Sequence, residues 1–104
     1  MIFRRSRFGD VVARQLEVFA TDEADLIDEC RDKERAYDRT DRDEAEEAYG
    51  DYMDVVEAAT EALADMRDRF ARTLDDASAE QYEDEFNRAV RRRWPPFGLE
   101  IENR

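Results

Sequence analysis

Apolar residues recur along the first third of the chain at steps of three and four positions, the spacing that gathers side chains on one face of an α-helix. The stripe consists of Phe8, Val12, Leu16, Phe19, Leu26, Cys30 and Tyr37. It predicts one amphipathic helix over about residues 9–38.

A second stripe is longer and has no interruption. Its members are Ala45, Tyr49, Tyr52, Val56, Ala59, Leu63, Met66, Phe70 and Leu74, and they predict a helix over about residues 41–75. The polar segment "DRTDRDE" separates the two stripes, and Thr40 or Asp41 within it suits a helix N-cap. A turn this short favours an antiparallel hairpin, in which we expect Cys30 to face Gly50 and the glycine to allow close approach of the helices.

A third, shorter stripe follows near the C-terminal end. Tyr82, Phe86, Val90 and Trp94 predict a helix over about residues 79–94, which Ser78 and Gln81 open as a capping box. Pro95 and Pro96 are expected to end it, because proline cannot continue a helix. The tail of residues 95–104 still carries Phe97, Leu99 and Ile101, so we predict that it runs in extended form and covers the apolar surface that the short helix leaves bare.

Together the stripes predict an all-α fold. We expect a long antiparallel helical hairpin plus a shorter third helix, similar to a three-helix bundle, with the extended tail packed on it. Residues 1–104 fit a single helical domain, since one domain usually holds about 100 to 150 residues.

The charge balance limits the kinds of molecule that the protein is expected to bind. The formal net charge is −12, and a surface of that sign repels the phosphate backbone, so the sequence argues against a nucleic-acid partner. No segment reaches the ~20 apolar residues that span a bilayer, and "MIFRRSRF" lacks the apolar core of a signal peptide. With a single cysteine the chain forms no internal disulfide. These features predict a cytoplasmic protein without a membrane partner.

Most catalytic constellations have no counterpart in the sequence. The chain contains no histidine, which removes the usual base of serine and cysteine nucleophiles and the Glu-x-x-His pairs of di-iron bundles. It has neither a glycine-rich phosphate loop nor zinc-ligand spacing. We therefore predict no catalytic residue and no cofactor.

Glu23 departs from the pattern because it falls inside the first apolar stripe. A buried carboxylate is normally paired, so we interpret it as bonded to a tyrosine hydroxyl or an arginine.

Two acidic segments support an alternative. "DEADLIDE" at residues 22–29 and "EEAYGDYMDVV" at residues 46–56 together resemble the MazG-like all-α nucleotide pyrophosphohydrolases, which carry an E-E-x-x-E run on one helix and E-x-x-D on the next. Asp22 and Glu23 match the first pair, whereas Leu26 stands where the third carboxylate belongs. Glu47 and Asp51 match the second motif with a step of four instead of three. The resemblance implies that Glu23, Glu47 and Asp51 hold Mg²⁺ for hydrolysis of a nucleoside triphosphate.

The interpretation we favour is a non-enzymatic interaction or scaffold module whose partner is another protein or a second copy of the chain. Its candidate interaction residues are Arg4, Arg5, Arg7, Trp94 and Phe97. The small side chains of Val55, Ala58 and Ala62 on one flank of the second helix leave room for another helix, which motivates a dimer hypothesis.

Overall fold

The computed structural model describes residues 7–104 and confirms an all-α fold for this part of the chain. Its helices are α1 (Gly9–Asp22), α2 (Ala24–Arg39), α3 (Ala45–Ala71), α4 (Asp76–Arg93) and α5 (Pro95–Glu102). Within residues 7–104 no helix combines the length and the apolar character needed to cross a bilayer.

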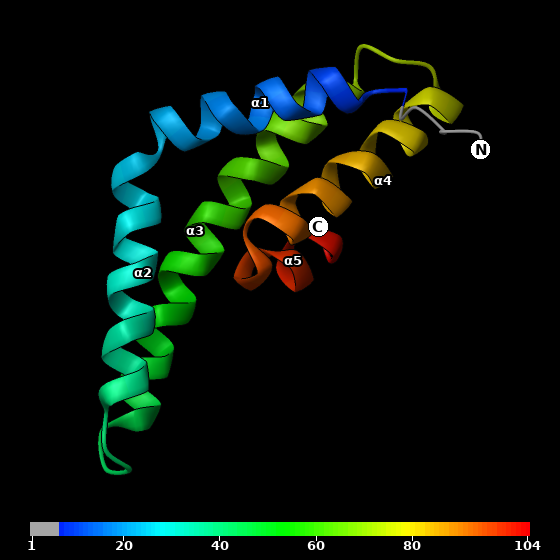
Figure 1. The fold of residues 1–104 in the computed structure, drawn as a ribbon. Coiled ribbons are helices and arrows are strands. Elements are labelled where there is room, and N and C mark those ends of the chain that lie inside the picture. The colour runs from blue at the N-terminus through cyan, green and yellow to red at the C-terminus, as the bar shows by residue number, and fades with distance from the viewer. Residues whose placement is uncertain (1–6) are drawn as a thin grey trace, which may run out of the picture.

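α2 and α3 form a long hairpin, and α1, α4 and α5 gather toward its open end (Figure 1). α2 packs along α3, α1 crosses onto α4, and α5 folds back between α3 and α4. The radius of gyration is 15.7 Å, larger than the roughly 13 Å of a compact domain of this length. The excess arises because the closed end of the hairpin projects beyond the other helices.

The first predicted helix is in fact two helices, so the prediction of one helix over residues 9–38 was wrong. The break falls at Glu23, with φ −112° and ψ 29°, between the buried residues Phe19 and Ile27. In a straight helix Glu23 would point into the apolar stripe, whereas here it is half-buried. The break also lets α1 leave the hairpin, so that Phe8 packs edge-on against Tyr82 of α4 at 5.6 Å between ring centroids.

The hairpin register also differs from the prediction. α2 ends at Arg39, and Asp41 accepts hydrogen bonds from the backbone N–H groups of Asp43 and Glu44 at 3.1 and 3.3 Å, which shapes a turn over residues 40–44. This wider turn shifts α3, and the Cys30 thiol donates to the Val55 carbonyl at 3.5 Å. Gly50 is exposed, and an added Cβ would meet nothing within 4 Å. The expected close approach at Gly50 was therefore wrong.

The C-terminal segment is helical rather than extended, which corrects the predicted tail. Pro95 and Pro96 occupy the first turn of α5, where the missing N–H groups would have no helical partner in any case. They end α4 and begin a new helix. Phe97 and Ile101 are buried, so the segment does cover part of the core, whereas Leu99 is 77% exposed.

α4 begins earlier than predicted and buries its predicted stripe. Asp75 is its N-cap, accepting a hydrogen bond from the Ser78 backbone N–H at 2.9 Å, so the helix starts at Asp76 instead of residue 79. The four stripe residues are all buried: Tyr82, Phe86, Val90 and Trp94.

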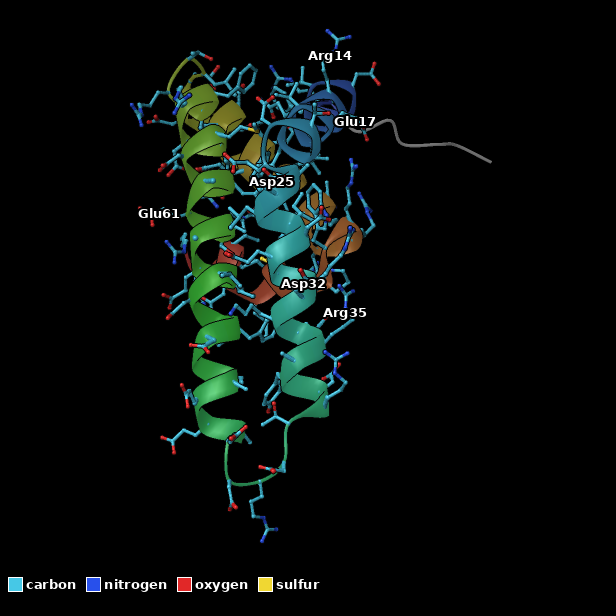
Figure 2. All side chains as sticks on the ribbon, turned by 90° about the vertical axis from the view of Figure 1, so that its left-hand side faces the viewer. Arg14, Glu17, Asp25, Asp32, Arg35 and Glu61 are labelled. Atoms are coloured by element: carbon cyan, nitrogen blue, oxygen red, sulfur yellow. The ribbon has the colours of Figure 1, made fainter. Side chains whose placement is uncertain are left out.

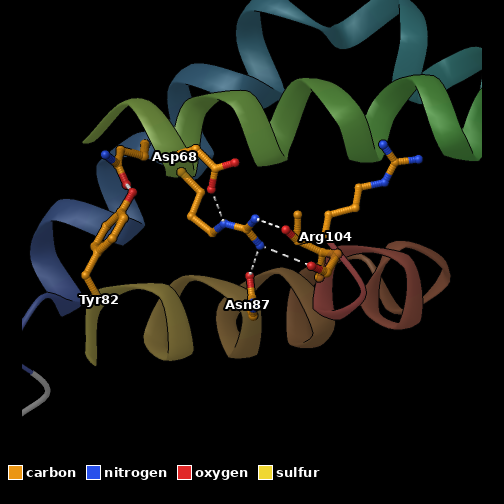
Figure 3. A network of polar contacts seen from close by, with 7 residues as sticks. Asp68, Tyr82, Asn87 and Arg104 are labelled. Atoms are coloured by element: carbon orange, nitrogen blue, oxygen red, sulfur yellow. Dashed lines mark hydrogen bonds and ion pairs between the residues drawn. The ribbon is translucent and has the colours of Figure 1, made fainter. Parts of the chain in front are cut away.

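A buried arginine ties α3, α4 and α5 together (Figure 3). Arg67 is only 3% exposed. It donates to the Asp68 carboxylate at 2.9 Å and to the Asn87 side-chain oxygen at 3.0 Å. It also donates to the main-chain oxygens of Ile101 and Arg104 at 3.1 and 2.8 Å. The last carbonyls of a helix have no partner within it, so Arg67 supplies donors that α5 lacks.

Replacing Arg67 with alanine should lower the free energy of unfolding by about 3 kcal/mol, because buried acceptors on α4 and α5 lose their donor. Urea denaturation measures the change. Arg69→Ala is the control, since Arg69 is exposed on the same helix and its loss should change stability by less than about 0.5 kcal/mol. Equal losses in the two variants would contradict a special role for Arg67.

Alanine substitution should change the free energy of unfolding in opposite directions at Gly50 and Gly98. Gly50→Ala should raise the free energy of unfolding by about 0.5 to 1 kcal/mol, because the site is helical and open. Gly98→Ala should lower it by about 1 to 3 kcal/mol, because the new Cβ would lie 2.8 Å from Cγ and 3.3 Å from Cα of Arg91. Thermal unfolding of both variants checks the signs, and a destabilised Gly50→Ala protein would disprove the register described above.

Candidate functional site

A groove lies between the α2–α3 hairpin and the turn that joins α4 to α5. It encloses a cavity of about 180 Å³. Its lining residues are Ile27, Cys30, Arg31, Glu34, Tyr52, Arg93, Trp94, Pro95, Pro96 and Phe97. A neighbouring hollow of about 240 Å³ extends toward the break between α1 and α2, and it shares Ile27, Arg31, Arg93 and Trp94 with the first. We refer to the 180 Å³ cavity as the groove.

The apolar floor of the groove is held by aromatic packing. Trp94 sits between α4 and α5, where its backbone (φ −132°, ψ 79°) turns the chain. Its ring packs edge-on against Phe19 at 5.4 Å between ring centroids, and at a tilt of 36° against Phe97 at 6.1 Å. Trp94 and Phe97 are 7% and 2% exposed. These two candidate interaction residues are therefore mainly core residues, and a ligand could contact them only through the groove.

Two arginines stand at the rim of the groove. Arg93 is ion-paired with Glu17 of α1 at 2.6 Å, and its guanidinium lies 4.7 Å from the centroid of the Trp94 ring. Arg31 pairs with Asp28 at 3.6 Å. Both arginines are exposed, and each is paired with a carboxylate, so the rim of the groove is lined by ion pairs.

Two polar groups of the groove, Cys30 and Tyr52, have pKa values that favour their neutral forms. Burial, reinforced by Glu29 and Glu34, raises the pKa of the Cys30 thiol to about 11. Burial likewise raises the pKa of Tyr52 to about 12, and its hydroxyl donates to the Glu34 carboxylate at 3.2 Å. Since the thiolate is the reactive form of cysteine, Cys30 is not activated as a nucleophile near neutral pH.

Beyond the groove the hairpin continues as a two-helix arm, which we define as residues 31–55 (Figures 1 and 2). None of the residues in this range is buried, although the residues on either side of it, Cys30 and Val56, belong to the core. Three tyrosines cluster on the arm: the Tyr37 ring stacks on Tyr52 at 6.4 Å and packs against Tyr49 at 5.4 Å. Tyr49 is 48% exposed.

The arm is also strongly acidic. It carries ten acidic and five basic residues. The bases all precede residue 43, so the α3 side, residues 43–55, has six acids and no base. In Figure 2 the hairpin is seen with side chains along its length pointing outward, Glu61 and Asp32 among those labelled.

The arginines near the N-terminal end are placed only in part. Arg4 and Arg5 lie outside the described residues. Arg7 donates to the Ser78 hydroxyl at 3.0 Å and lies 4.9 Å from the Phe8 ring centroid, so it holds the start of α1 against the start of α4.

The carboxylates of the metal hypothesis are not brought together. Glu23 lines a hollow of about 250 Å³ with Asp65 and Arg69 of α3. Asp51 lies 14 positions before Asp65, which is about 21 Å along a helix. Glu47 and Asp51 are both exposed. Across residues 7–104 no group of three or more Asp, Glu, Cys or His side chains is arranged to hold a metal ion.

Sequence reasoning missed the groove and the arm. The groove joins α2 residues such as Ile27 and Arg31 to a proline turn more than 60 positions away, and no local pattern encodes that meeting. The arm had a weak signal, because the predicted stripes change there from aliphatic to tyrosine residues.

Comparisons of the chain with models of known protein families, with curated proteins and with solved structures found no match. Functional assignment therefore rests on the contacts, burial and charge of this chain.

The groove predicts a loss of stability at alkaline pH. The pKa of Cys30 is about 11 in the folded chain against 9.0 ordinarily, so the folded state holds this proton more tightly and its contribution is complete below pH 9. That contribution should be lost as the pH rises from 9 to about 11. Burial raises the pKa of Tyr52 and Tyr82 to about 12, which extends the loss upward. Urea unfolding across this range checks it, and Cys30→Ala should remove the part that begins near pH 9. A pH-independent stability would be inconsistent with these shifts.

Proposed function

We propose that the protein is a cytoplasmic, non-enzymatic interaction module, and that the arm together with the groove is its contact surface. The observation that carries the proposal is the absence of any buried residue between positions 31 and 55, in a segment that nevertheless forms regular helices. Because this segment adds little to the core, its side chains are available for contacts with another molecule.

The aromatic content of the arm supports this proposal. Tyrosine is enriched at protein interfaces, because its ring buries a large area at low entropic cost while its hydroxyl still bonds to water or a partner. Tyr37, Tyr49 and Tyr52 form such a cluster, in which Tyr49 is exposed, Tyr37 is half-buried and Tyr52 lines the groove. Partly exposed aromatic residues gathered in one place mark interaction sites more often than scattered ones do.

Self-association is the first form that such a module can take. Val55 and Ala62 are half-buried and Ala58 is exposed on α3, so a neighbouring helix has access to them. Sedimentation of the purified protein tests this hypothesis, and a monomer at high micromolar concentration would exclude the dimer.

The function predicts that Tyr49 matters for binding and little for folding. Tyr49→Ala should change the free energy of unfolding by less than about 1 kcal/mol, because the side chain is already half in water. A photo-reactive amino acid at position 49, introduced into cells that make the protein, should yield a discrete cross-linked product.

The matched control carries the same photo-reactive group in place of Val18, which is 46% exposed on α1, outside the arm and away from Ala58 and Ala62. It should yield no such product. The mass of the product distinguishes a second copy from another protein. Cross-linking that is equal at the two positions, or absent at both, would contradict the proposed contact surface.

A further inference from the structure

We infer that the arm binds a basic amphipathic α-helix of another protein, which lies along the hairpin as its third helix and inserts an apolar side chain into the groove. This inference rests on the proposed function and names the chemistry of the partner. Three features of the described residues carry it: an uncovered face, its charge, and the pocket at its end.

The uncovered face continues a surface that is already used for helix packing. Higher on the hairpin, α5 packs against α3, and its first residues face α2 across the groove. Glu34 of α2 and Tyr52 of α3 line the groove together with Pro95 and Pro96, so the face of the arm begins where α5 begins. It continues to Tyr37 and Tyr49, whose rings are in contact. Two antiparallel helices leave a trough of the width that a third helix fills.

The charge of the arm selects a basic occupant. The α3 side, residues 43–55, carries six acids and no base. Glu46 lies three positions before Tyr49, and residues at that spacing are neighbours on a helix surface, so acidic groups border the tyrosines. The α2 side, residues 31–42, has four acids and five bases, so it is the α3 side that attracts the lysine and arginine side chains of a partner helix.

The groove supplies an anchoring pocket at one end of the face. Its cavity of about 180 Å³ exceeds the roughly 150 Å³ that accommodates a benzene ring in an engineered protein cavity. Ile27, Trp94 and Phe97 give it an apolar floor. Arg31 and Arg93 at the rim are already paired with Asp28 and Glu17, so the apolar anchor of the partner lies at the groove and its basic residues lie along the acidic α3 side.

The test uses a designed probe: a fluorescent amphipathic helical peptide of about 18 residues, with leucines and one phenylalanine on its apolar face and lysines elsewhere. A second peptide with glutamate in place of each lysine is its counterpart. Fluorescence anisotropy against the full chain should show binding of the basic peptide only, and this binding should weaken as salt is added.

Matched variants separate the arm from general attraction to an acidic protein. Glu46→Lys and Glu61→Lys change the net charge equally on exposed positions of α3, but only Glu46 lies on the arm. We expect Glu46→Lys to weaken binding about fivefold and Glu61→Lys to change it less than about twofold. Tyr49→Ala should weaken binding about tenfold, whereas Val18→Ala, at a similarly exposed apolar site on α1, should not.

The inference is overturned if the basic peptide does not bind, if the acidic peptide binds as well, or if the two lysine variants behave alike. Dimerisation through the arm that strengthens with added salt would also overturn it, in favour of a second copy. If one of these results is obtained but a photo-reactive group at position 49 still cross-links to a partner, only the inference fails and the proposed function is retained. If that cross-linking is also absent, the proposed function is contradicted as well.

Discussion

The fold depends on a single buried guanidinium. Arg67 reaches from α3 to Asn87 on α4 and to the main-chain oxygens of Ile101 and Arg104. A charge in the interior is costly unless every donor finds an acceptor, and here the acceptors come from three parts of the chain. The observed placement of α5 brings the main-chain oxygens of Ile101 and Arg104 to the guanidinium. Arg67 therefore favours this docking of the C-terminal helix, while apolar burial supplies the driving force.

This docking decides where the core ends. α5 packs on α3 and sets Pro95 and Pro96 on the other side of the groove from Tyr52, so the groove exists because α5 lies there. Above that point the hairpin is part of a packed core that includes Leu63, Phe86 and Ile101. Below it the two helices have only each other. The same contact that completes the core thus leaves the arm bare.

Helical periodicity predicted much of this architecture, because burial on a helix follows the angular position of each residue. The stripe on α4 was right at each position, and the apolar residues of the tail were rightly assigned to the core. The errors have other causes. A helical wheel assumes a straight axis, so it kept Glu23 in the stripe where the chain breaks. The prediction that Thr40 or Asp41 caps the second helix was also wrong: α3 begins only at Ala45, because Asp41 instead accepts hydrogen bonds within the turn, and Gly50 lies in solvent. Arg67 and the groove depend on residues distant in sequence, for which periodicity carries no signal.

The arm also divides the molecule into two units of unequal cooperativity. Local opening costs least where few apolar contacts are lost, and residues 31–55 have no buried member to lose. Backbone amides near the turn of residues 40–44 should therefore exchange with solvent through local fraying of the hairpin, whereas those of α4 should exchange only through global unfolding. Adding or removing whole helical turns at this end should therefore leave the packed core unchanged. The length of the arm, and with it the distance at which the protein contacts a partner, can vary independently of the fold.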